Sequence, residues 1–282
     1  MTSDMTVVIF AKDAAARVAE TTKALRGQVR RVVVADLGST DGTGGAAARH
    51  GAEVIRYDTA PTHVELVRGE VLDRVDDTWI LFLDDDEVPD RNLIRELDAI
   101  MTEDRVDVVY ISTLDYFFGE PVRAAGWQPE NLSFARFFRR GSLMFDTKVH
   151  SPIAPVKGAR KMRLAPDRGL LHHFSYESVS HFLQKLDRYT TVEGQQLAAN
   201  VFGNRRATLK WWFYALAEPF SLSLRHKGLW GGWRARSLIA MMVAYRAASW
   251  AKSKEIHEGY GAERARAKYR ELTARLLSGD EQ

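Results

Sequence analysis

The chain has 282 residues, of which 45% are hydrophobic, and this is enough for the core of one large α/β domain with an appendage. It contains no cysteine, so a disulfide framework, thiolate metal ligands and cysteine nucleophiles are excluded. The formal net charge is +3, but residues 205–282 alone carry 15 Lys and Arg against 7 Asp and Glu. This C-terminal segment is therefore basic, whereas residues 1–204 are acidic.

Strands and helices alternate along the first 113 residues. Apolar and β-branched runs predict strands at residues 5–11, 30–36, 53–56, 78–84 and 106–113. The patterns between them predict helices at residues 14–27, 42–51, 62–75 and 90–102. This alternation is typical of a doubly wound, mostly parallel sheet. From 114 to about 170, frequent glycine and proline predict irregular loops, where substrate chemistry is usually placed.

The strand predicted at residues 30–36 runs into a polar turn, Asp-Leu-Gly-Ser-Thr-Asp-Gly-Thr at residues 36–43. A strand, a glycine-containing turn and a helix together build a nucleotide crevice at the carboxyl edge of a parallel sheet. Asp36 lies at the exit of the strand, where its carboxylate could accept hydrogen bonds from a base or a ribose. Ser39 and its polar neighbours fit equally well as helix caps, which is the commoner use of such residues.

An apolar run, Trp-Ile-Leu-Phe-Leu, leads straight into four carboxylates at residues 84–87. Four acids inside a buried strand would cost a large desolvation energy, so we expect them where the strand leaves the sheet. Crowded carboxylates repel one another unless a hard divalent cation neutralises them, and Mg²⁺ or Mn²⁺ with substrate phosphates is the usual solution. The alternative is an acidic helix N-terminus, because Pro89 can open a helix.

Taken together, these segments resemble the family-2 glycosyltransferases of the GT-A fold. Residues 7–13, which include Ala11 and Asp13, resemble the first strand and nucleotide-binding turn of that family. Residues 36–43 are similar to its acidic Gly-Ser-Thr-Asp-Gly-Thr signature, and residues 84–87 to its Asp-x-Asp metal motif. Four later segments resemble the bacterial subgroup that glycosylates lipopolysaccharide or oligosaccharide cores: Gly-Trp at 126–127, Arg-Phe-Phe-Arg-Arg at 136–140, Val-His at 149–150 and His-Phe-Ser-Tyr at 173–176.

The resemblance implies an α/β fold with a mostly parallel, Rossmann-like sheet flanked by helices. Residues 1–204 would form the GT-A catalytic domain, with a nucleotide-sugar half to about 113 and an acceptor half at 114–204. Residues 205–282 would form a basic, aromatic-rich helical extension. The implied reaction is a metal-dependent, inverting transfer from a nucleoside-diphosphate sugar, with a UDP-sugar expected, to a lipid-linked or cell-envelope glycan.

The resemblance also implies site residues. The donor would contact Ala11, Asp13, Asp36, Ser39, Arg68, Asp84 and Asp85. The metal, Mg²⁺ or Mn²⁺, would be held by Asp84, Asp86 and His173, and would stabilise the charge that grows on the leaving phosphate. Arg68 stands where the family commonly has an arginine, and we expect it at the diphosphate.

The acceptor side is expected to include Trp127, Arg136 and Arg139. An indole offers a sugar ring a flat apolar face, and guanidinium groups bind phosphate or carboxylate in a fork. The alternative is a core tryptophan and a solvated basic strand.

An inverting transfer also needs a base within hydrogen-bond reach of the attacking hydroxyl. In the resembling subgroup a glutamate usually follows the Val-His pair, but this chain has Ser151 there. His150, Asp146 and Glu87 are the candidates that remain. The departure also leaves open a nucleotide-sugar-binding protein that does not catalyse, and a soluble acceptor such as a peptide or natural product is a further alternative.

The C-terminal segment contains five of the seven tryptophans: Trp211, Trp212, Trp230, Trp233 and Trp250. Tryptophan with arginine and lysine beside apolar stretches such as residues 237–245 suits a helix at a lipid interface. Arg236 and Arg246 bound that stretch well short of the ~20 residues that a membrane span needs. Packing against the catalytic domain or a partner subunit is the alternative, and an oligomer is possible.

Other partners and the location follow from what the sequence lacks. No nucleic-acid-binding motif is found, so nucleic acid is not an expected partner. The first residues show no basic region followed by an apolar stretch, so we expect no signal peptide and a cytoplasmic location. Lipid contact through the C-terminal extension would place the protein on the inner face of the plasma membrane.

Overall fold

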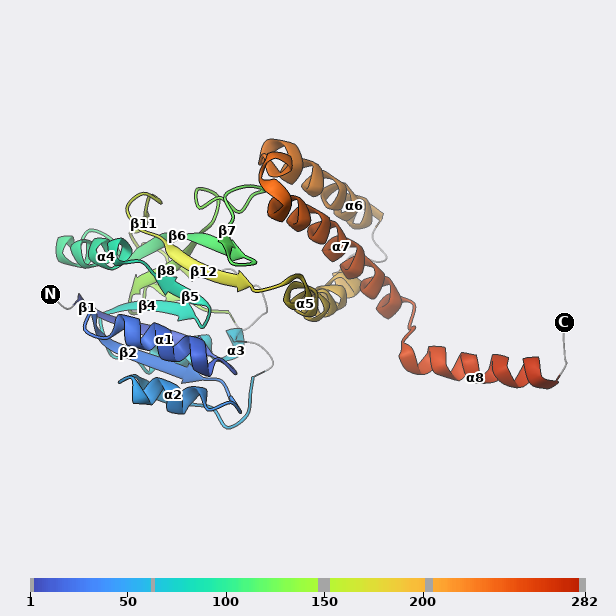
Figure 1. Cartoon of the computed structure of the whole chain (residues 1–282), viewed down its shortest axis with the longest axis horizontal. Coiled ribbons are helices and arrows are strands. Elements are labelled where there is room, and N and C mark those ends of the chain that lie inside the picture. The colour runs from blue at the N-terminus through green and yellow to red at the C-terminus, as the bar shows by residue number, and fades with distance from the viewer. Residues whose placement is uncertain (1–2, 62–63, 147–152, 201–204, 279–282) are drawn as a thin grey trace. The chain divides into compact units, whose positions relative to one another are not determined.

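The structure is a computed structural model that describes residues 3–61, 64–146, 153–200 and 205–278 (Figure 1). The chain divides into two compact units. The first contains Met1–Arg123 and Trp127–Ser175, and the second contains Ala124–Gly126 and Tyr176–Gln282. The division falls earlier than the boundary after residue 204 that the sequence suggested, because the helix that follows Ser175 packs with the C-terminal helices.

The first unit alternates strands with helices. Their bounds are β1 Ser3–Ala11, α1 Ala15–Leu25, β2 Val29–Asp36, α2 Thr43–Arg49, β3 Glu53–Arg56, α3 Glu65–Asp73, β4 Trp79–Asp84, β5 Glu87–Pro89, α4 Arg91–Glu103, β6 Val108–Phe117, β7 Glu120–Pro121, β8 Ser133–Arg139, β9 Leu143–Met144, β10 Ala154–Pro155, β11 Lys161–Arg163 and β12 Leu171–Tyr176. Every strand and helix that the sequence predicted before residue 113 is present.

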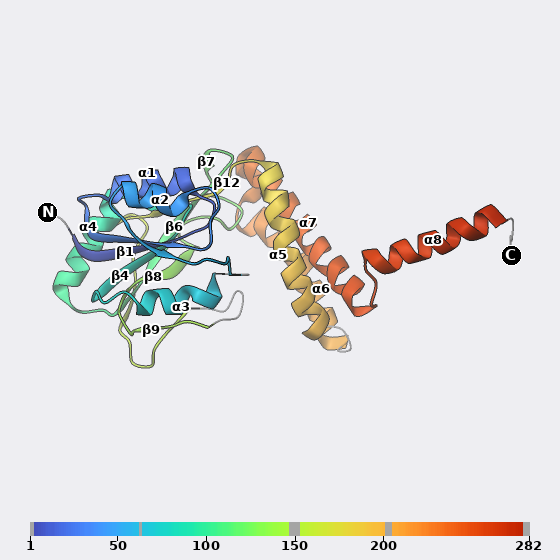
Figure 2. The same ribbon diagram turned by 90° about the horizontal axis from the view of Figure 1, so that it is seen from below.

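The main sheet has the strand order β3-β2-β1-β4-β8-β6-β12-β5. The strands β3, β2, β1 and β4 are parallel, as the alternation of strands and helices predicted. β8 then pairs antiparallel with both β4 and β6, so the second half of the sheet is mixed. The α/β class with a mostly parallel sheet at the nucleotide half is confirmed, and the helices lie against this sheet (Figures 1 and 2).

The region from 114 to 170 contains more strand than the sequence indicated. β7 to β11 all lie in it, and β6 continues to Phe117. Most of these strands are only two or three residues long, too short for the period-2 pattern that identifies a strand. β8 is longer, but it is stabilised by pairing with two strands distant in sequence, which no local pattern reveals.

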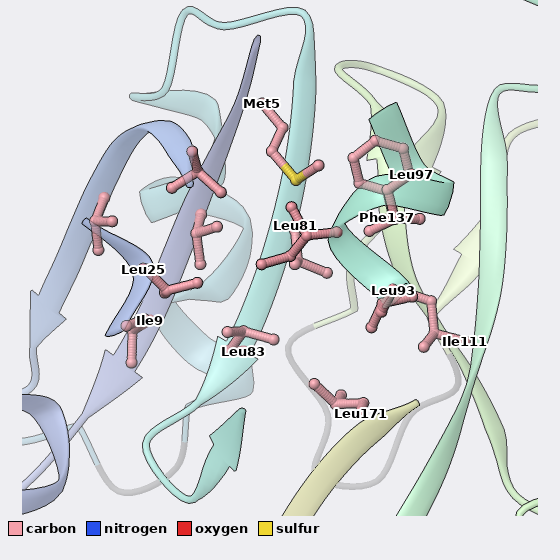
Figure 3. Close-up of a cluster of buried hydrophobic side chains, with 14 of the residues drawn as sticks. Met5, Ile9, Leu25, Leu81, Leu83, Leu93, Leu97, Ile111, Phe137 and Leu171 are labelled. Atoms are coloured by element: carbon pink, nitrogen blue, oxygen red, sulfur yellow. The ribbon is translucent and has the colours of Figure 1, made fainter. Parts of the chain in front are cut away.

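Both faces of the sheet are buried, and successive side chains of each central strand alternate between them. Ile9 and Leu81 point into the cluster drawn in Figure 3, together with Leu97 from α4. Phe10 and Phe82 belong to the cluster on the other face. A strand covered on both faces reads as a continuous apolar run, so its first exposed polar residues mark the point where it leaves the sheet.

The second unit is helical, which confirms the predicted C-terminal helical extension. Its elements are α5 Val179–Asn200, α6 Arg205–Phe220, the π turn η1 Ser221–Arg225, the 3-10 turn η2 Gly228–Trp230, α7 Gly232–His257 and α8 Ala262–Ser278. α5 and α7 pack side by side (Figure 2). Small residues allow their close approach: Ser249 and Ser253 are fully buried, and a Cβ at Gly194 would lie 3.0 Å from the Lys252 side chain.

The apolar stretch at residues 237–245 lies within α7. Leu238 and Met241 from this stretch are buried inside the unit. Among the described residues, no helix is both long enough and apolar enough to cross a membrane.

Candidate active site

Three parallel strands end side by side at one edge of the sheet. Ala11, the last residue of β1, pairs in register with Asp36 at the end of β2. On the other side of β1, Phe10 pairs with Asp84 at the end of β4. Because the carboxyl ends of parallel strands share one edge, Asp36 and Asp84 flank the exit of β1, where ligands bind in folds of this kind.

Asp36 is enclosed by the turn that follows β2. The residue is 2% exposed, and its Oδ1 accepts a hydrogen bond from the Ser39 backbone N–H at 2.9 Å. Gly44 makes room for Oδ2, because a Cβ at that position would lie 2.7 Å from this oxygen. Gly38 has φ of +75° and passes so close to Ala60 that a Cβ would lie 2.6 Å from the Ala60 backbone nitrogen. The glycines therefore let the backbone close around the Asp36 carboxylate.

The polar residues of this turn cap the start of α1, and Asp41 Oδ1 also accepts the Thr43 N–H at the start of α2 at 3.0 Å. Ser39 Oγ accepts a hydrogen bond from the Asp13 N–H at 3.0 Å, and Thr43 Oγ1 accepts one from the Ala14 N–H at 2.9 Å. Asp13, whose φ is +49°, accepts a hydrogen bond in return from the Thr40 N–H at 2.8 Å. These contacts satisfy N–H groups at the start of α1 and join the two turns beside the strand ends. Ser39 and Asp13 thus shape the site through the turns.

The partly exposed Asp84 and the buried Glu87 form an ion-pair group with Arg136 of β8. Arg136 Nη2 donates to Asp84 Oδ2 at 2.9 Å and to Glu87 Oε1 at 2.6 Å, and its guanidinium lies 4.8 Å from the centre of the Phe82 ring. Glu87 Oε2 also accepts the Asp84 backbone N–H at 2.9 Å. Burial raises the pKa of Glu87 to about 7, although Arg136 opposes this shift. Arg136 therefore holds the Asp84 and Glu87 carboxylates together on the side of the sheet.

The acidic residues do not form the first turn of a helix. α4 begins at Arg91, and its N-cap is Asp90, whose Oδ1 accepts the Leu93 N–H at 2.7 Å. Residues 84–87 come before this cap, at the exit of β4 and the start of β5. The cluster thus lies where the desolvation argument placed it.

Asp85 points away from Arg136, toward the turn after β1. Its Oδ2 accepts the Lys12 backbone N–H at 3.3 Å, and its Oδ1 lies 3.2 Å from Arg17 Nη2 of α1. Burial raises the pKa of Asp85, and the Arg17 charge opposes this. Asp85 therefore links the β4 exit to the β1 exit.

Asp86 faces the imidazole of His173 on β12. His173 Nε2 lies 3.4 Å from Asp86 Oδ1, and His173 Nδ1 lies 2.5 Å from Asp115 Oδ1. Ser175 Oγ donates to the same Asp115 oxygen at 2.8 Å. Burial lowers the pKa of His173, but the hydrogen bonds to Asp115 and Asp86 outweigh it and raise the pKa to about 10. The imidazole is thus held between two carboxylates.

This arrangement suits a divalent cation with few protein ligands. A histidine that binds a metal usually donates its other ring nitrogen to a carboxylate, as His173 can to Asp115. Asp84, which the sequence also suggested as a ligand, forms an ion pair with Arg136 through Oδ2. Within the described ranges, no group of three or more acidic or histidine side chains gathers for a metal. Asp86 and His173 therefore fit an ion that completes its shell with substrate phosphates and water, as Mg²⁺ does.

Arg68 of α3 lies beside the acidic group. Its guanidinium is 5.8 Å from the centre of the Phe10 ring and 5.6 Å from that of Phe82. Its Nε is buried and has no hydrogen-bond partner within the described part of the chain. Burial lowers the pKa of Arg68, and the nearby Asp84 charge opposes this. A buried donor without a partner is costly, and an anionic ligand would relieve that cost.

The remaining candidates are not gathered at one place. Trp127 is half-buried, and its ring packs edge-on against Phe117 at 5.7 Å. Arg139 pairs in register with Trp79 at the start of β4, so it lies at the opposite end of that strand from Asp84. Its guanidinium stacks on the Trp79 ring at 4.9 Å and forms ion pairs with Asp104 and Asp107. The structure therefore brings Arg136, but not Arg139, to the acidic group.

Asp146 and His150 belong to the segment after β9. Asp146 is exposed and follows Phe145, whose ring packs 6.2 Å from Phe82 and 6.0 Å from Phe138. His150 lies outside the described residues.

Sequence reasoning missed Asp115 and Ser175. Both are buried, at 5% and 3% exposed, and both contact His173. One signal was available: Asp115 interrupts an apolar stretch of β6, and an acid in a buried strand needs a partner.

Comparisons with known proteins address the family of the chain. The model of glycosyl transferase family 2 matches residues 6–163, which is more than half of the chain. A comparison with curated protein sequences gave no match.

Solved structures give more distant likenesses. S. aureus TarS 1-349 in complex with UDP-GlcNAc is 14% identical, covers 92% of this chain and 93% of that one, and has a TM-score of 0.47. A longer S. aureus TarS chain has the same identity of 14% and TM-score of 0.47, and the match covers only 55% of its length. Glucosyl-3-phosphoglycerate synthase from Mycobacterium tuberculosis, in complex with Mn²⁺, UDP and glucosyl-3-phosphoglycerate, is 21% identical over 42% of this chain and 45% of that one, with a TM-score of 0.33. The match to the family model over more than half of its length shows that this chain belongs to glycosyl transferase family 2.

Proposed function

We propose that the chain transfers a sugar from a nucleoside-diphosphate sugar, and most specifically a UDP-sugar, to a hydroxyl group of a glycan acceptor. Membership of glycosyl transferase family 2 supports the reaction class. The observation that carries the proposal is the strand-end geometry: the enclosed carboxylate of Asp36 lies on one side of β1, and the acidic segment with Asp86 and His173 lies on the other. A nucleotide and its diphosphate need these two kinds of contact close together.

Each donor-binding residue has a role that its surroundings support. Asp36 would accept hydrogen bonds from the base or the ribose, and Ala11, Asp13 and Ser39 would shape the turns around it. Arg68 would donate its buried Nε–H toward the diphosphate. Asp84 and Asp85 would act indirectly, since Arg136 and Arg17 bind their carboxylates.

The proposed metal is Mg²⁺ or Mn²⁺, held by Asp86 and His173. When bound, the cation would supply Lewis-acid stabilisation for charge on the leaving diphosphate. Asp115 would hold the His173 ring by its Nδ1 so that Nε2 faces Asp86. Asp84 is the third proposed ligand, and its Oδ2 also holds Arg136.

An inverting transfer would use a base from Asp146, Glu87 or His150. Glu87 is 2% exposed and bonded to both Arg136 and the Asp84 N–H, which favours a supporting role. Asp146 is exposed and follows the packed Phe145, and it stays a candidate for the base. His150 stays a proposal on sequence alone.

For the acceptor we propose a lipid-linked or cell-envelope glycan, with a cytoplasmic enzyme that works on the membrane surface. Support comes from the resemblance of residues 126–127, 136–140 and 173–176 to the lipopolysaccharide and oligosaccharide core subgroup, and from the basic C-terminal segment. Trp127 would stack on the acceptor sugar. A soluble acceptor is the alternative. Ser151 in place of a glutamate favours a second candidate, a nucleotide-sugar-binding protein that does not catalyse.

The test is a panel of nucleotide sugars, each measured for thermal stabilisation with and without Mn²⁺. A ligand at a hundred times its Kd should add about 2.7 kcal/mol to the free energy of unfolding. We expect a UDP-sugar to stabilise the wild type more strongly with Mn²⁺, and Asp86→Asn to keep its fold but lose the Mn²⁺-dependent part. No stabilisation by any nucleotide sugar would contradict the proposal. Stabilisation by a UDP-sugar, with no transfer of its sugar and no release of UDP in the presence of any glycan acceptor, would favour the non-catalytic protein.

A further inference from the structure

The two faces of α6 differ sharply in their surroundings. One face packs against α7: the Trp211 and Trp250 rings stack with their centres 4.9 Å apart, and Glu218 Oε2 accepts the Arg246 Nε–H at 2.6 Å. These contacts fix α6 beside α7 within the second unit.

The opposite face of α6 exposes large apolar side chains. Leu209, Phe213, Leu216 and Phe220 are spaced at i, i+4, i+7 and i+11, and their exposed fractions are 73%, 67%, 70% and 68%. We call these four residues the α6 stripe. An exposed apolar row of this length on a helix marks a surface that normally contacts something other than water.

Two exposed tryptophans follow, one at the end of the 3-10 turn η2 and one in the first turn of α7. Trp230 is 71% exposed and Trp233 is 53% exposed, and the Arg234 guanidinium lies 4.7 Å from the Trp233 ring centre. Tryptophan with an adjacent cation is typical of the headgroup level of a membrane.

The segment that contains the stripe is strongly basic. Residues 205–254 contain ten Lys and Arg but only one acid, Glu218, and Arg246 binds that acid within the helix packing. Arg206, Lys210 and Lys227 are exposed. A second copy of this chain would bring the same positive surface against it and would be repelled, whereas an anionic surface is complementary.

We propose that the α6 stripe, with Trp230 and Trp233, is a docking surface for the headgroup region of an anionic lipid bilayer. The stripe would lie in the interface plane, and the cations beside it would contact the lipid phosphates. This rests on the proposed function, because it names the surface that would carry the enzyme to a lipid-linked acceptor. It replaces the sequence-based expectation for residues 237–245, whose Leu238 and Met241 are buried in the helix packing.

The experiment is co-sedimentation of the intact protein with vesicles of phosphatidylcholine containing phosphatidylglycerol, compared with pure phosphatidylcholine. We expect binding to the anionic vesicles that weakens as salt rises. The double variant Phe213→Glu/Leu216→Glu should lower the partition coefficient about tenfold or more. Lys227→Gln, which removes one positive charge, should lower it about fivefold.

The matched control is Leu276→Glu/Leu277→Glu on α8, where the two leucines are 78% and 84% exposed. These control substitutions should leave vesicle binding unchanged, and UDP binding should be unchanged in every variant. Equal vesicle binding by wild type and the Phe213→Glu/Leu216→Glu variant would overturn the proposal. So would a lipid-free dimer that dissociates in that variant, since the stripe would then bind a second copy. If the wild type does not bind UDP, that result would instead refute the proposed donor site and leave the vesicle result unaffected.

Discussion

His173 has a carboxylate beside each of its ring nitrogens, and these contacts set the orientation of the imidazole at the proposed metal site. Nδ1 is 2.5 Å from Asp115 and Nε2 is 3.4 Å from Asp86. Ser175 fixes the Asp115 oxygen from the other side. A ring fixed in this way presents one chosen nitrogen toward Asp86 without further reorganisation.

Asp115→Asn tests this positioning. An amide can no longer stabilise the Nδ1–H tautomer by charge, so the affinity of the UDP-bound protein for Mn²⁺ should fall about 10- to 100-fold. Electron paramagnetic resonance of free and bound Mn²⁺ measures this directly. Asp107→Asn, just before the other end of β6, is the control and should leave Mn²⁺ affinity unchanged. Equal Mn²⁺ affinity in Asp115→Asn and the wild type would show that Asp115 has no positioning role.

At the residue scale, the sequence identifies which side chains stand at strand exits but not which partners they find. Asp36 and Asp84 follow apolar runs, so their place at the sheet edge could be predicted. Arg136 and Arg139 occur in one short strand, yet only the register of β8 against β4 decides that Arg136 meets Asp84 while Arg139 stacks on Trp79. That register depends on pairing between residues far apart in the chain.

At the scale of elements, the first turn of α2 contains two adjacent glycines in different surroundings. A Cβ at Gly44 would lie 2.7 Å from Asp36 Oδ2, whereas the nearest atom to a Cβ at Gly45 is Arg49 Nη1 at 3.8 Å. The helix therefore has room for a side chain at one position and not at the other.

Gly44→Ala and Gly45→Ala make a matched pair. Gly45→Ala should raise the free energy of unfolding by about 0.5–1 kcal/mol, because alanine favours the helix, and should leave UDP affinity unchanged. Gly44→Ala should displace the Asp36 carboxylate and weaken UDP binding. Calorimetric titration with UDP and chemical denaturation measure the two effects. Equal UDP affinity in both variants would argue against Asp36 as a nucleotide ligand.

A helix or strand could be predicted from the sequence when a local pattern identifies it, and not when it depends on pairing with residues distant in sequence. Helices and parallel strands before residue 113 carry patterns of period 3.6 or long apolar runs, and these are local signals. β8 and β12 are recognised only through their neighbours in the sheet, which are β4 and β6 for β8 and β6 and β5 for β12. The site needs both kinds of strand, because β12 carries His173 and the parallel strands carry Asp36 and Asp84.

At the scale of the whole molecule, the two features on which the proposals rest belong to different units. The first unit holds the strand-end site, and the second holds the α6 stripe and most of the tryptophans. Composition alone predicted that the C-terminal part differs from the rest. It could not separate Leu238 and Met241, which are buried in the helix packing of α7, from the exposed stripe on α6, because both stretches are apolar in sequence and only the packing of the helices distinguishes them.

The central claim is that the edge formed by β1, β2 and β4 binds a nucleotide and a divalent cation together. A crystal structure with UDP and Mn²⁺, with anomalous scattering recorded for manganese, tests this most directly. The account predicts an anomalous peak between Asp86 and His173, with the diphosphate beside Arg68 and the uridine against Asp36. A nucleotide bound elsewhere, or a manganese peak away from Asp86 and His173, would contradict it.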